Sequence, residues 1–334
     1  MFSAESPSAR LLQLASGFRT TQALYVVAKL GVADLLLSGP RSCEELARDV
    51  GAHSESLFRV MRALASLGVF YQDSSDRFAL NPMSYLLLKD APGSVRAAVV
   101  FWGGEMYRAA GELMHSVKTG ETAFNHIYGE GHFEYLSKNP EANEIFNTMM
   151  AQMIGANPSR RSIEKYDFQG RKVVVDVGGG SGTLLASVLE RNPQLKGILY
   201  DLPSALETAP SLLKSRQVDS RVKVISGSAF DSLPGGGDVY IFSRVLHDHP
   251  DEVSTQILKH CRKVIPRDGL VLIGDAVIPK GDTPSQGKLV DLTMLLMTGG
   301  KERTEEEWKK LLKAGGFSLQ SADVEQSLVV ATPD

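Results

Sequence analysis

Cysteine is scarce in this chain: only Cys43 and Cys261 occur among its 334 residues, far apart and without a Cys-x-x-Cys pair. This argues against a disulfide framework and fits a reducing cytosol. An excess of charge of one sign is also lacking, because 36 Lys and Arg residues stand against 39 Asp and Glu residues, for a formal net charge of −3. The chain as a whole therefore has no electrostatic pull toward nucleic acid or acidic lipid.

Long apolar runs are absent as well. No segment approaches the ~20 apolar residues that a membrane helix requires. The first residues, Met1 to Pro7, have neither the basic start nor the apolar stretch of a signal peptide. We therefore expect a cytoplasmic protein without a membrane partner. The length of 334 residues allows one large or two ordinary domains with a substantial core.

The most informative segment that is present contains a cluster of glycines. Three valines followed by Asp176 and Val177 predict a buried strand, since β-branched residues fit a pleat and the run does not alternate. The glycines at 178–180 predict a tight turn, and the apolar periodicity of Thr183–Glu190 predicts a helix. A strand, a glycine turn and a helix N-terminus together form a site for a nucleotide-like ligand.

The spacing of these glycines narrows the ligand. A dinucleotide-binding turn needs glycine at its first, third and sixth positions, but the sixth position here is Thr183. The actual pattern, Asp-x-Gly-x-Gly-x-Gly, suits a ligand without a pyrophosphate whose carboxylate and ribose lie against the turn. S-adenosylmethionine is such a ligand. The pattern alone leaves a purely structural turn open.

The first 91 residues predict a winged-helix domain. Ser42 and Glu45 form a capping box at the start of a helix that ends at Val50, a second helix covers 54–66, and a short hairpin follows at 69–80. A DNA-binding interpretation is disfavoured because basic and acidic residues balance in this segment. A packing or dimerisation module is the better interpretation, with the apolar helix Leu24–Leu37 as a candidate subunit interface.

The remainder divides into a helical connector over residues 92–165 and an alternating region over 166–334. Met and aromatic residues at helical spacing in the connector are typical of a core, or of a substrate wall if the connector covers the second region. The alternation of strands and helices after Val173 predicts a parallel, doubly wound α/β sheet. Its strands are expected at 173–177, 197–201, 222–226, 239–243 and 270–275, with a closing antiparallel pair at 317–324 and 328–332.

Ligands of such sheets bind beyond the carboxyl ends of the strands. Asp201 lies about twenty residues after the glycines, where an acidic residue can hold the two ribose hydroxyls. Ser228 and Ala229 follow the third strand, where an adenine would lie. The expected cofactor-binding residues at these strand ends are Asp176, Gly178, Gly179, Gly180, Asp201, Ser228, Ala229 and Ser243.

His247 follows the fourth strand and is the strongest catalytic candidate. Methyl transfer from a sulfonium to a hydroxyl requires aligned reactants and removal of the acceptor proton, which an imidazole can take. Asp275 and Glu302 are candidate acidic partners, although a core histidine without function remains an alternative. A metal cluster at 247–251 is disfavoured because Pro250 and a helix start would scatter the ligands.

Several motifs in the same order resemble the S-adenosylmethionine-dependent small-molecule O-methyltransferases. They are Val175-Asp-Val-Gly-Gly-Gly-Ser-Gly182, Asp201-Leu-Pro203, Val245-Leu-His-Asp248 and Gly299-Gly-Lys-Glu-Arg-Thr304. The resemblance implies a Rossmann-like catalytic domain, an N-terminal winged-helix dimerisation domain, a homodimer, and a reaction without metal. It also implies that His247 is the general base, supported by Asp275 and Glu302, and that Asn147, Met150 and Met294 lie on the substrate wall.

The chain departs from the family pattern at three positions. Ser228 stands where an Asp commonly holds the adenine amino group, His249 stands where Trp is common, and Asp275 stands where Glu is frequent. The expected function is methyl transfer to a hydroxyl of a small, aromatic acceptor. The alternatives are N-methylation or a non-methylating reaction on the same fold, or a winged-helix regulator that senses a metabolite.

Overall fold

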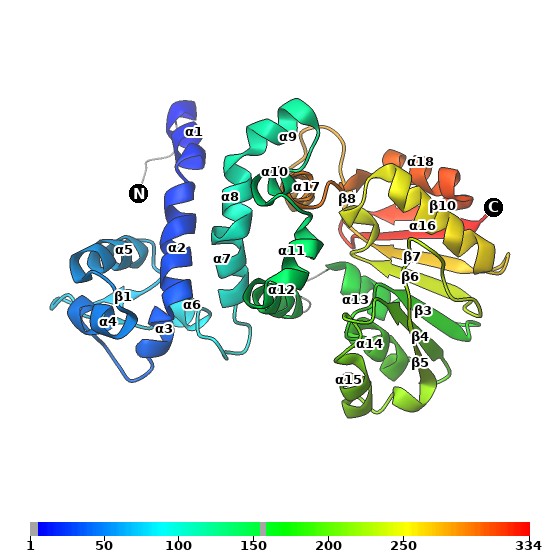
Figure 1. The fold of residues 1–334 in the computed structure, drawn as a ribbon, viewed down its shortest axis with the longest axis horizontal. Helices are drawn as coiled ribbons and strands as arrows, with labels where there is room; N and C mark the ends of the chain where they lie inside the picture. Colours follow the sequence, from blue (N-terminus) through cyan, green and yellow to red (C-terminus); the bar gives the residue numbers. More distant parts are fainter. Residues whose placement is uncertain (1–5, 154–157) are drawn as a thin grey trace. The chain divides into compact units, whose positions relative to one another are not determined.

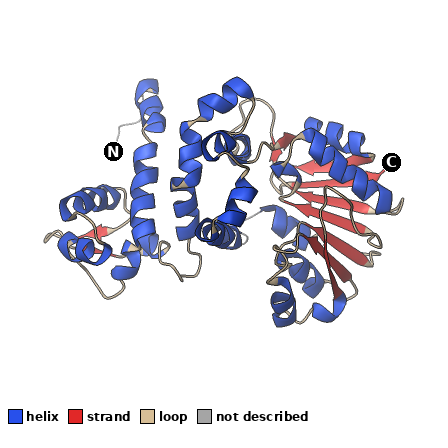
Figure 2. Ribbon diagram, viewed as in Figure 1, coloured by secondary structure: helices blue, strands red, loops and turns tan. Residues whose placement is uncertain are grey.

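The computed structural model describes residues 6–153 and 158–334. Backbone contacts divide the chain into two compact units, Met1–Met114 with Phe124–Gly155 and His115–Ala123 with Ala156–Asp334. Helices dominate the first unit, whereas the second contains the large sheet (Figure 2). Within the described residues, every helix is too short or too polar to cross a bilayer.

The N-terminal part of the first unit has the predicted winged-helix elements. Ser42 accepts the Glu45 N–H while Glu45 accepts the Ser42 N–H, so the capping box is confirmed. The hairpin is shorter than expected because Val69 and Phe70 turn into the core instead of pairing. The elements are α1 (Pro7–Ala15), α2 (Phe18–Leu30), α3 (Val32–Leu35), α4 (Cys43–Val50), α5 (Ser54–Ser66), β1 (Tyr71–Gln72), β2 (Phe78–Ala79) and α6 (Pro82–Tyr85).

The predicted helical character of residues 92–165 is also confirmed in the described part of the chain. Phe101, Phe124 and Phe146 surround His132 with ring centroids 5.1–5.8 Å from it. Phe101 and Phe124 are buried, so these two aromatic residues belong to a core. The helices are α7 (Arg96–Gly103), α8 (Glu105–Gly111), α9 (Leu113–Thr119), α10 (Ala123–Tyr128), α11 (His132–Lys138), α12 (Pro140–Met153) and α13 (Pro158–Glu164).

The second unit is built on a seven-stranded sheet in the order β10-β11-β7-β6-β3-β4-β5. Five strands are parallel, and β11 joins β7 antiparallel, which confirms the doubly wound sheet and its closing pair. The strands are β3 (Val173–Val177), β4 (Lys196–Asp201), β5 (Val222–Ser226), β6 (Val239–Ser243), β7 (Leu270–Gly274), β10 (Phe317–Asp323) and β11 (Leu328–Pro333). A separate two-stranded sheet pairs β8 (Val277–Ile278) with β9 (Arg303–Thr304).

Helices cover both faces of the large sheet, with α16 and α18 on one face and α13, α14 and α15 on the other (Figure 1). Apolar clusters bury both faces of β3, β4, β6 and β7, which explains the run of valines in β3. The helices are α14 (Thr183–Arg191), α15 (Ala209–Ser215), α16 (Asp251–Val264), α17 (Gln286–Met297) and α18 (Glu305–Gly315). Among these helices, α17 had not been predicted.

The strand order sets the position of the site. From β3 the chain builds outward through β4 and β5 and then returns to the other side of β3 with β6. The chain connections that follow β3 and β6 therefore run in opposite directions, and this opens a crevice at the carboxyl ends of the two strands. Asp201, Ser243 and the glycine turn after Val177 all lie at this edge.

Candidate active site

The glycine turn after β3 packs closely on its inner side. Gly178 has φ +70, and its N–H donates to the Tyr200 carbonyl at 2.8 Å. A Cβ at Gly178 would lie 2.7 Å from Val245 Cγ2, and one at Gly179 would lie 2.6 Å from Asp176 Oδ2. Gly180 also has a positive φ, but nothing lies within 4 Å of its missing Cβ. The turn therefore excludes side chains on its inner side and is open at Gly180.

Asp201 is fixed against this turn from the end of β4. Its Oδ2 accepts the Gly180 N–H at 2.8 Å, and its Oδ1 accepts the N–H of Leu202 at 2.7 Å. Burial raises the pKa of Asp201, although both backbone donors oppose the shift. Each carboxylate oxygen can accept a further hydrogen bond. The side chain is thus oriented beside the open glycine with acceptor capacity left for a pair of hydroxyl groups.

Asp176 lies beneath the turn and is 1 % exposed. Among the described residues neither of its carboxylate oxygens has a hydrogen-bond partner of normal geometry. Burial and the nearby charge of Asp201 raise the pKa of Asp176 to about 7. Buried acceptors without partners are costly. Together with the open turn at Gly180, they fit a ligand that brings ammonium and hydroxyl donors, such as S-adenosylmethionine.

The residues expected around the adenine lie at the ends of β5 and β6. Ser228 Oγ accepts the Phe230 N–H at 3.2 Å, and the Ala229 carbonyl is 3.1 Å from His260 Nδ1. Ser243 is half-buried at the end of β6. Phe230 was not among the predicted cofactor-binding residues, and its exposed ring meets the His249 ring edge-on with centroids 5.2 Å apart. Phe230 follows Ser228 and Ala229 directly, so its position at a strand end was the available signal.

His247 lies in a 3-10 turn, Leu246–Asp248, between β6 and α16. Its Nδ1 is 2.7 Å from Glu302 Oε1, and both side chains are buried. Asp275 has a different contact, since its Oδ2 accepts the backbone N–H of His247 at 3.1 Å. Of the two acidic partners expected for the imidazole, Glu302 therefore binds the ring and Asp275 holds the main chain.

Negative charge surrounds the imidazole. Burial alone would lower the pKa of His247, but the charges of Asp248 and Asp275 and the hydrogen bond to Glu302 raise it to about 9. Burial raises the pKa of Asp275 to about 6, opposed by the attraction of His247. The site thus favours an imidazole that has gained a proton, as a general base must after it has acted.

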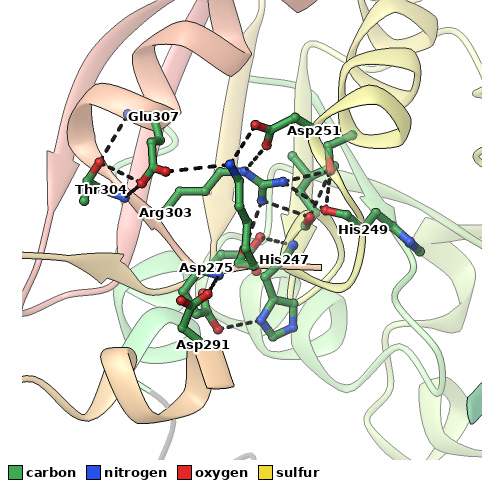
Figure 3. Close-up of polar contacts among 12 residues, drawn as sticks. His247, His249, Asp251, Asp275, Asp291, Arg303, Thr304 and Glu307 are labelled. Atoms are coloured by element: carbon green, nitrogen blue, oxygen red, sulfur yellow. Dashed lines mark hydrogen bonds and ion pairs between the residues drawn. The ribbon is translucent and has the colours of Figure 1, made fainter. Parts of the chain in front are cut away.

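Arg303 holds the backbone on both sides of His247 and is fully buried (Figure 3). Its Nη1 donates to the Leu246 carbonyl at 3.1 Å, and its Nη2 donates to the His249 carbonyl at 2.9 Å. Asp251 accepts from its Nε at 2.9 Å and neutralises the charge. Sequence reasoning missed Arg303, although it follows Glu302 directly. Two adjacent residues therefore hold His247, since Glu302 binds its ring and Arg303 binds the main chain on either side of it.

Gly300 lets this segment approach the histidine. A Cβ there would overlap the carbonyl oxygen of His247 and the backbone of Asp248. Gly300→Ala is therefore expected to lower the unfolding free energy by about 1–3 kcal/mol, the usual cost of overpacking, and to reduce turnover. Denaturant unfolding and initial rates measure the two effects.

Gly111→Ala is the matched control for Gly300→Ala. Gly111 lies in helix α8, and nothing lies within 4 Å of its missing Cβ. Its substitution is expected to leave both stability and turnover close to the unsubstituted protein. Equal behaviour of the two variants would show that the close approach at Gly300 has no consequence.

Comparison with known proteins matches two families along the chain. Residues 111–318 match the O-methyltransferase domain, and residues 12–90 match the O-methyltransferase dimerisation domain. The chain belongs to the O-methyltransferase family. Enzymes of this family use S-adenosylmethionine, and the dimerisation domain makes this O-methyltransferase a homodimer.

The relatives of this O-methyltransferase include enzymes of bacterial natural-product pathways. Phenazine O-methyltransferase PhzM of Lysobacter antibioticus is 41% identical over 313 residues, 94% of this chain and 92% of its own length. Phenazine-1-carboxylate N-methyltransferase of Pseudomonas aeruginosa is 33% identical, over 93% of this chain and 92% of its length. The same family thus contains enzymes named for transfer to oxygen and to nitrogen.

Solved structures agree with the fold. The crystal structure of LaPhzM has a TM-score of 0.90 at 40% identity and covers 99% of this chain and 100% of its own. The O-methyltransferase NcsB1 from neocarzinostatin biosynthesis, in complex with S-adenosylmethionine and 2-hydroxy-5-methyl naphthoic acid, has a TM-score of 0.86 at 32% identity, with 97% and 98% coverage. These likenesses extend over both units of the O-methyltransferase.

The residues expected on the substrate wall lie in different units. Asn147 is exposed and Met150 half-buried on α12 in the first unit, whereas Met294 is buried on α17 in the second. Their common role in an acceptor site of this O-methyltransferase stays a prediction. Within the described residues of both units, no three His, Cys, Asp or Glu side chains form a group that could hold a metal ion.

Proposed function

We propose that this O-methyltransferase methylates a hydroxyl group of a small aromatic acceptor, with His247 as the general base. The observation that carries the proposal is the buried contact between His247 Nδ1 and Glu302 Oε1, 2.7 Å long, at the carboxyl ends of the strands. Bound S-adenosylmethionine supplies an electrophilic methyl group on a sulfonium. Because Glu302 accepts a hydrogen bond from Nδ1–H, the lone pair of Nε2 is available for the acceptor proton.

The remaining residues have supporting roles in this proposal. Asp201 binds the ribose hydroxyls, Asp176 and the glycine turn bind the methionine end, and Ser228, Ala229 and Ser243 lie along the adenine. Asp275 holds the His247 backbone and stabilises the imidazolium by its charge. The acceptor is held by Asn147, Met150 and Met294. The homodimer functions in the cytoplasm, as expected from the scarcity of cysteine.

The acceptor class is inferred from the relatives. Two relatives, with 34% and 33% identity, are named for methylation of 3-amino-4-hydroxybenzoate and of 2,7-dihydroxy-5-methyl-1-naphthoate. In both compounds the methyl-accepting hydroxyl is on an aromatic ring. A phenol with a pKa near ~10 is mostly protonated at neutral pH, so that transfer to it requires a base. A buried His–Glu pair meets that requirement.

A screen with labelled cofactor tests the acceptor class. Phenolic and hydroxylated heteroaromatic compounds are compared with matched compounds that carry an amino group in place of the hydroxyl. We expect products that gain one CH₂ on oxygen. Exclusive methylation of the amino compounds would support N-methylation instead. A relative at 34% identity is named as an N,N-dimethyltransferase. Label transfer to none of them would contradict the proposed acceptor class.

Turnover is expected to rise with pH as His247 loses its proton. Only the neutral imidazole can act as a base, and the pKa of His247 is raised from 6.5 to about 9. The value of kcat/KM should therefore fall by about tenfold per pH unit below an apparent pKa that lies above 6.5. Glu302→Gln removes a negative charge from the ring and should move this limb to lower pH. A wild-type limb at or below pH 6.5 would contradict the assignment.

A further inference from the structure

We propose that Asp291 is a positioning residue that fixes the backbone of Glu302 and so orients the His247–Glu302 pair. Asp291 lies on α17, eleven residues before Glu302, and its Oδ1 accepts the Glu302 N–H at 2.8 Å. The inference rests on the proposed base role of His247. It adds a residue that acts on the base without touching it.

Glu302 needs such a fixed point because its own side chain makes few hydrogen bonds. Its Oε1 binds His247 Nδ1, whereas its Oε2 has no hydrogen-bond partner in the described part of the chain. Glu302 is 3 % exposed, so bulk solvent does not supply the missing partner. Side-chain contacts alone therefore leave the rotation of the Glu302 carboxylate under the control of a single hydrogen bond.

The backbone before Glu302 is conformationally permissive. Two of the four residues between the end of α17 at Met297 and Glu302 are glycines, and Gly299 has φ +76. Downstream of Glu302, Arg303 anchors the chain through its contacts on both sides of His247. Asp291 supplies the anchor at Glu302 itself, so the loop that carries Glu302 is tied down from α17 as well as from β9.

Among the contacts of the described residues, Asp291 reaches the imidazole only through Glu302. The charged groups that act on Asp291 are the carboxylates of Glu302 and Glu307 and the ammonium of Lys301, and burial raises its pKa. Two of these three charged neighbours are carboxylates, and the hydrogen bond that Asp291 accepts comes from the backbone N–H of Glu302. That contact supports a positioning role for Asp291.

The contact also connects the base to helix α17. Met294, which we place on the acceptor wall, follows Asp291 on the same helix by three residues and so lies on a nearby part of its surface.

Single and double variants test the inference in the full-length dimer. Asp291→Ala is expected to lower kcat about 10- to 100-fold, while the cofactor Kd and the midpoint of thermal unfolding stay close to wild type. Asp291→Asn retains an oxygen that accepts the Glu302 N–H and should restore most of the rate. Asp282→Ala, at an exposed acidic residue just before α17, is the matched control and should retain full activity.

The decisive measurement repeats Asp291→Ala in a Glu302→Ala background. If Asp291 acts through Glu302, the double variant should be no slower than Glu302→Ala alone. Additive losses, or an Asp291→Asn variant as slow as Asp291→Ala, would overturn the inference. If Glu302→Ala and His247→Ala both turn over at the wild-type rate, the proposed function fails and the positioning role with it. If Glu302→Ala and His247→Ala lose activity while Asp291→Ala remains fully active, only the positioning role of Asp291 is overturned.

Discussion

Replacing His247 by alanine is expected to lower kcat by about 10²–10⁴-fold, the usual effect of removing a general base. The imidazole lies at the carboxyl ends of the strands, its neutral form can accept a proton on Nε2, and Glu302 holds it from Nδ1. Cofactor binding should persist, because the glycine turn and Asp201 lie on other segments of the sheet edge. Single-turnover rates with saturating cofactor, together with titration calorimetry, separate the two effects.

A graded series strengthens this test. Glu302→Gln retains an oxygen that can accept a hydrogen bond from Nδ1–H but loses the charge that stabilises the imidazolium. Its rate should therefore lie between those of wild type and His247→Ala. Near wild-type activity of His247→Ala on a phenolic acceptor would remove His247 from the mechanism, whatever the behaviour of Glu302→Gln. Equal loss with phenolic and amino acceptors would indicate a structural role for the histidine.

Asp201→Ala is expected to weaken cofactor binding by about 100-fold. Hydrogen bonds to a charged group contribute about 1.5–3 kcal/mol each, and a tenfold change in Kd corresponds to about 1.4 kcal/mol. Two ribose hydroxyls on one carboxylate therefore account for a loss of this size. Titration calorimetry with S-adenosylhomocysteine, the reaction product, measures the Kd without turnover. An unchanged Kd would refute the ribose role.

The control for Asp201→Ala addresses the geometry of the turn. Asp201 also accepts the N–H groups of Gly180 and Leu202, so its removal could disturb the backbone rather than the ligand contact. Asp201→Asn retains one oxygen for the Gly180 N–H but loses the charge and one acceptor for the ribose. If affinity falls in Asp201→Asn while thermal unfolding of the free protein is unchanged, the loss belongs to the ligand contact.

Local sequence patterns predicted the parts of this protein that depend on neighbouring residues. The valine run of β3 was predicted because a strand buried on both faces needs continuous β-branched residues. The capping box at Ser42 follows from side chains three residues apart, and its helix begins as expected. Helix α17 was not predicted, because its hydrophobic residues do not concentrate on one face.

The sequence by itself determined the doubly wound sheet, the glycine turn and the residues at the strand ends, because β propensity, periodicity and glycine conformation act over a few residues. Only the tertiary structure decided how those residues divide their work around His247. Glu302 binds the ring, Asp275 holds the backbone, and Arg303 ties down both flanking carbonyls. These contacts join segments up to 57 residues apart, and no local pattern specifies which of two nearby carboxylates reaches an imidazole. That choice depends on the register of β7 and on the path of the loop between α17 and β9, which packing fixes.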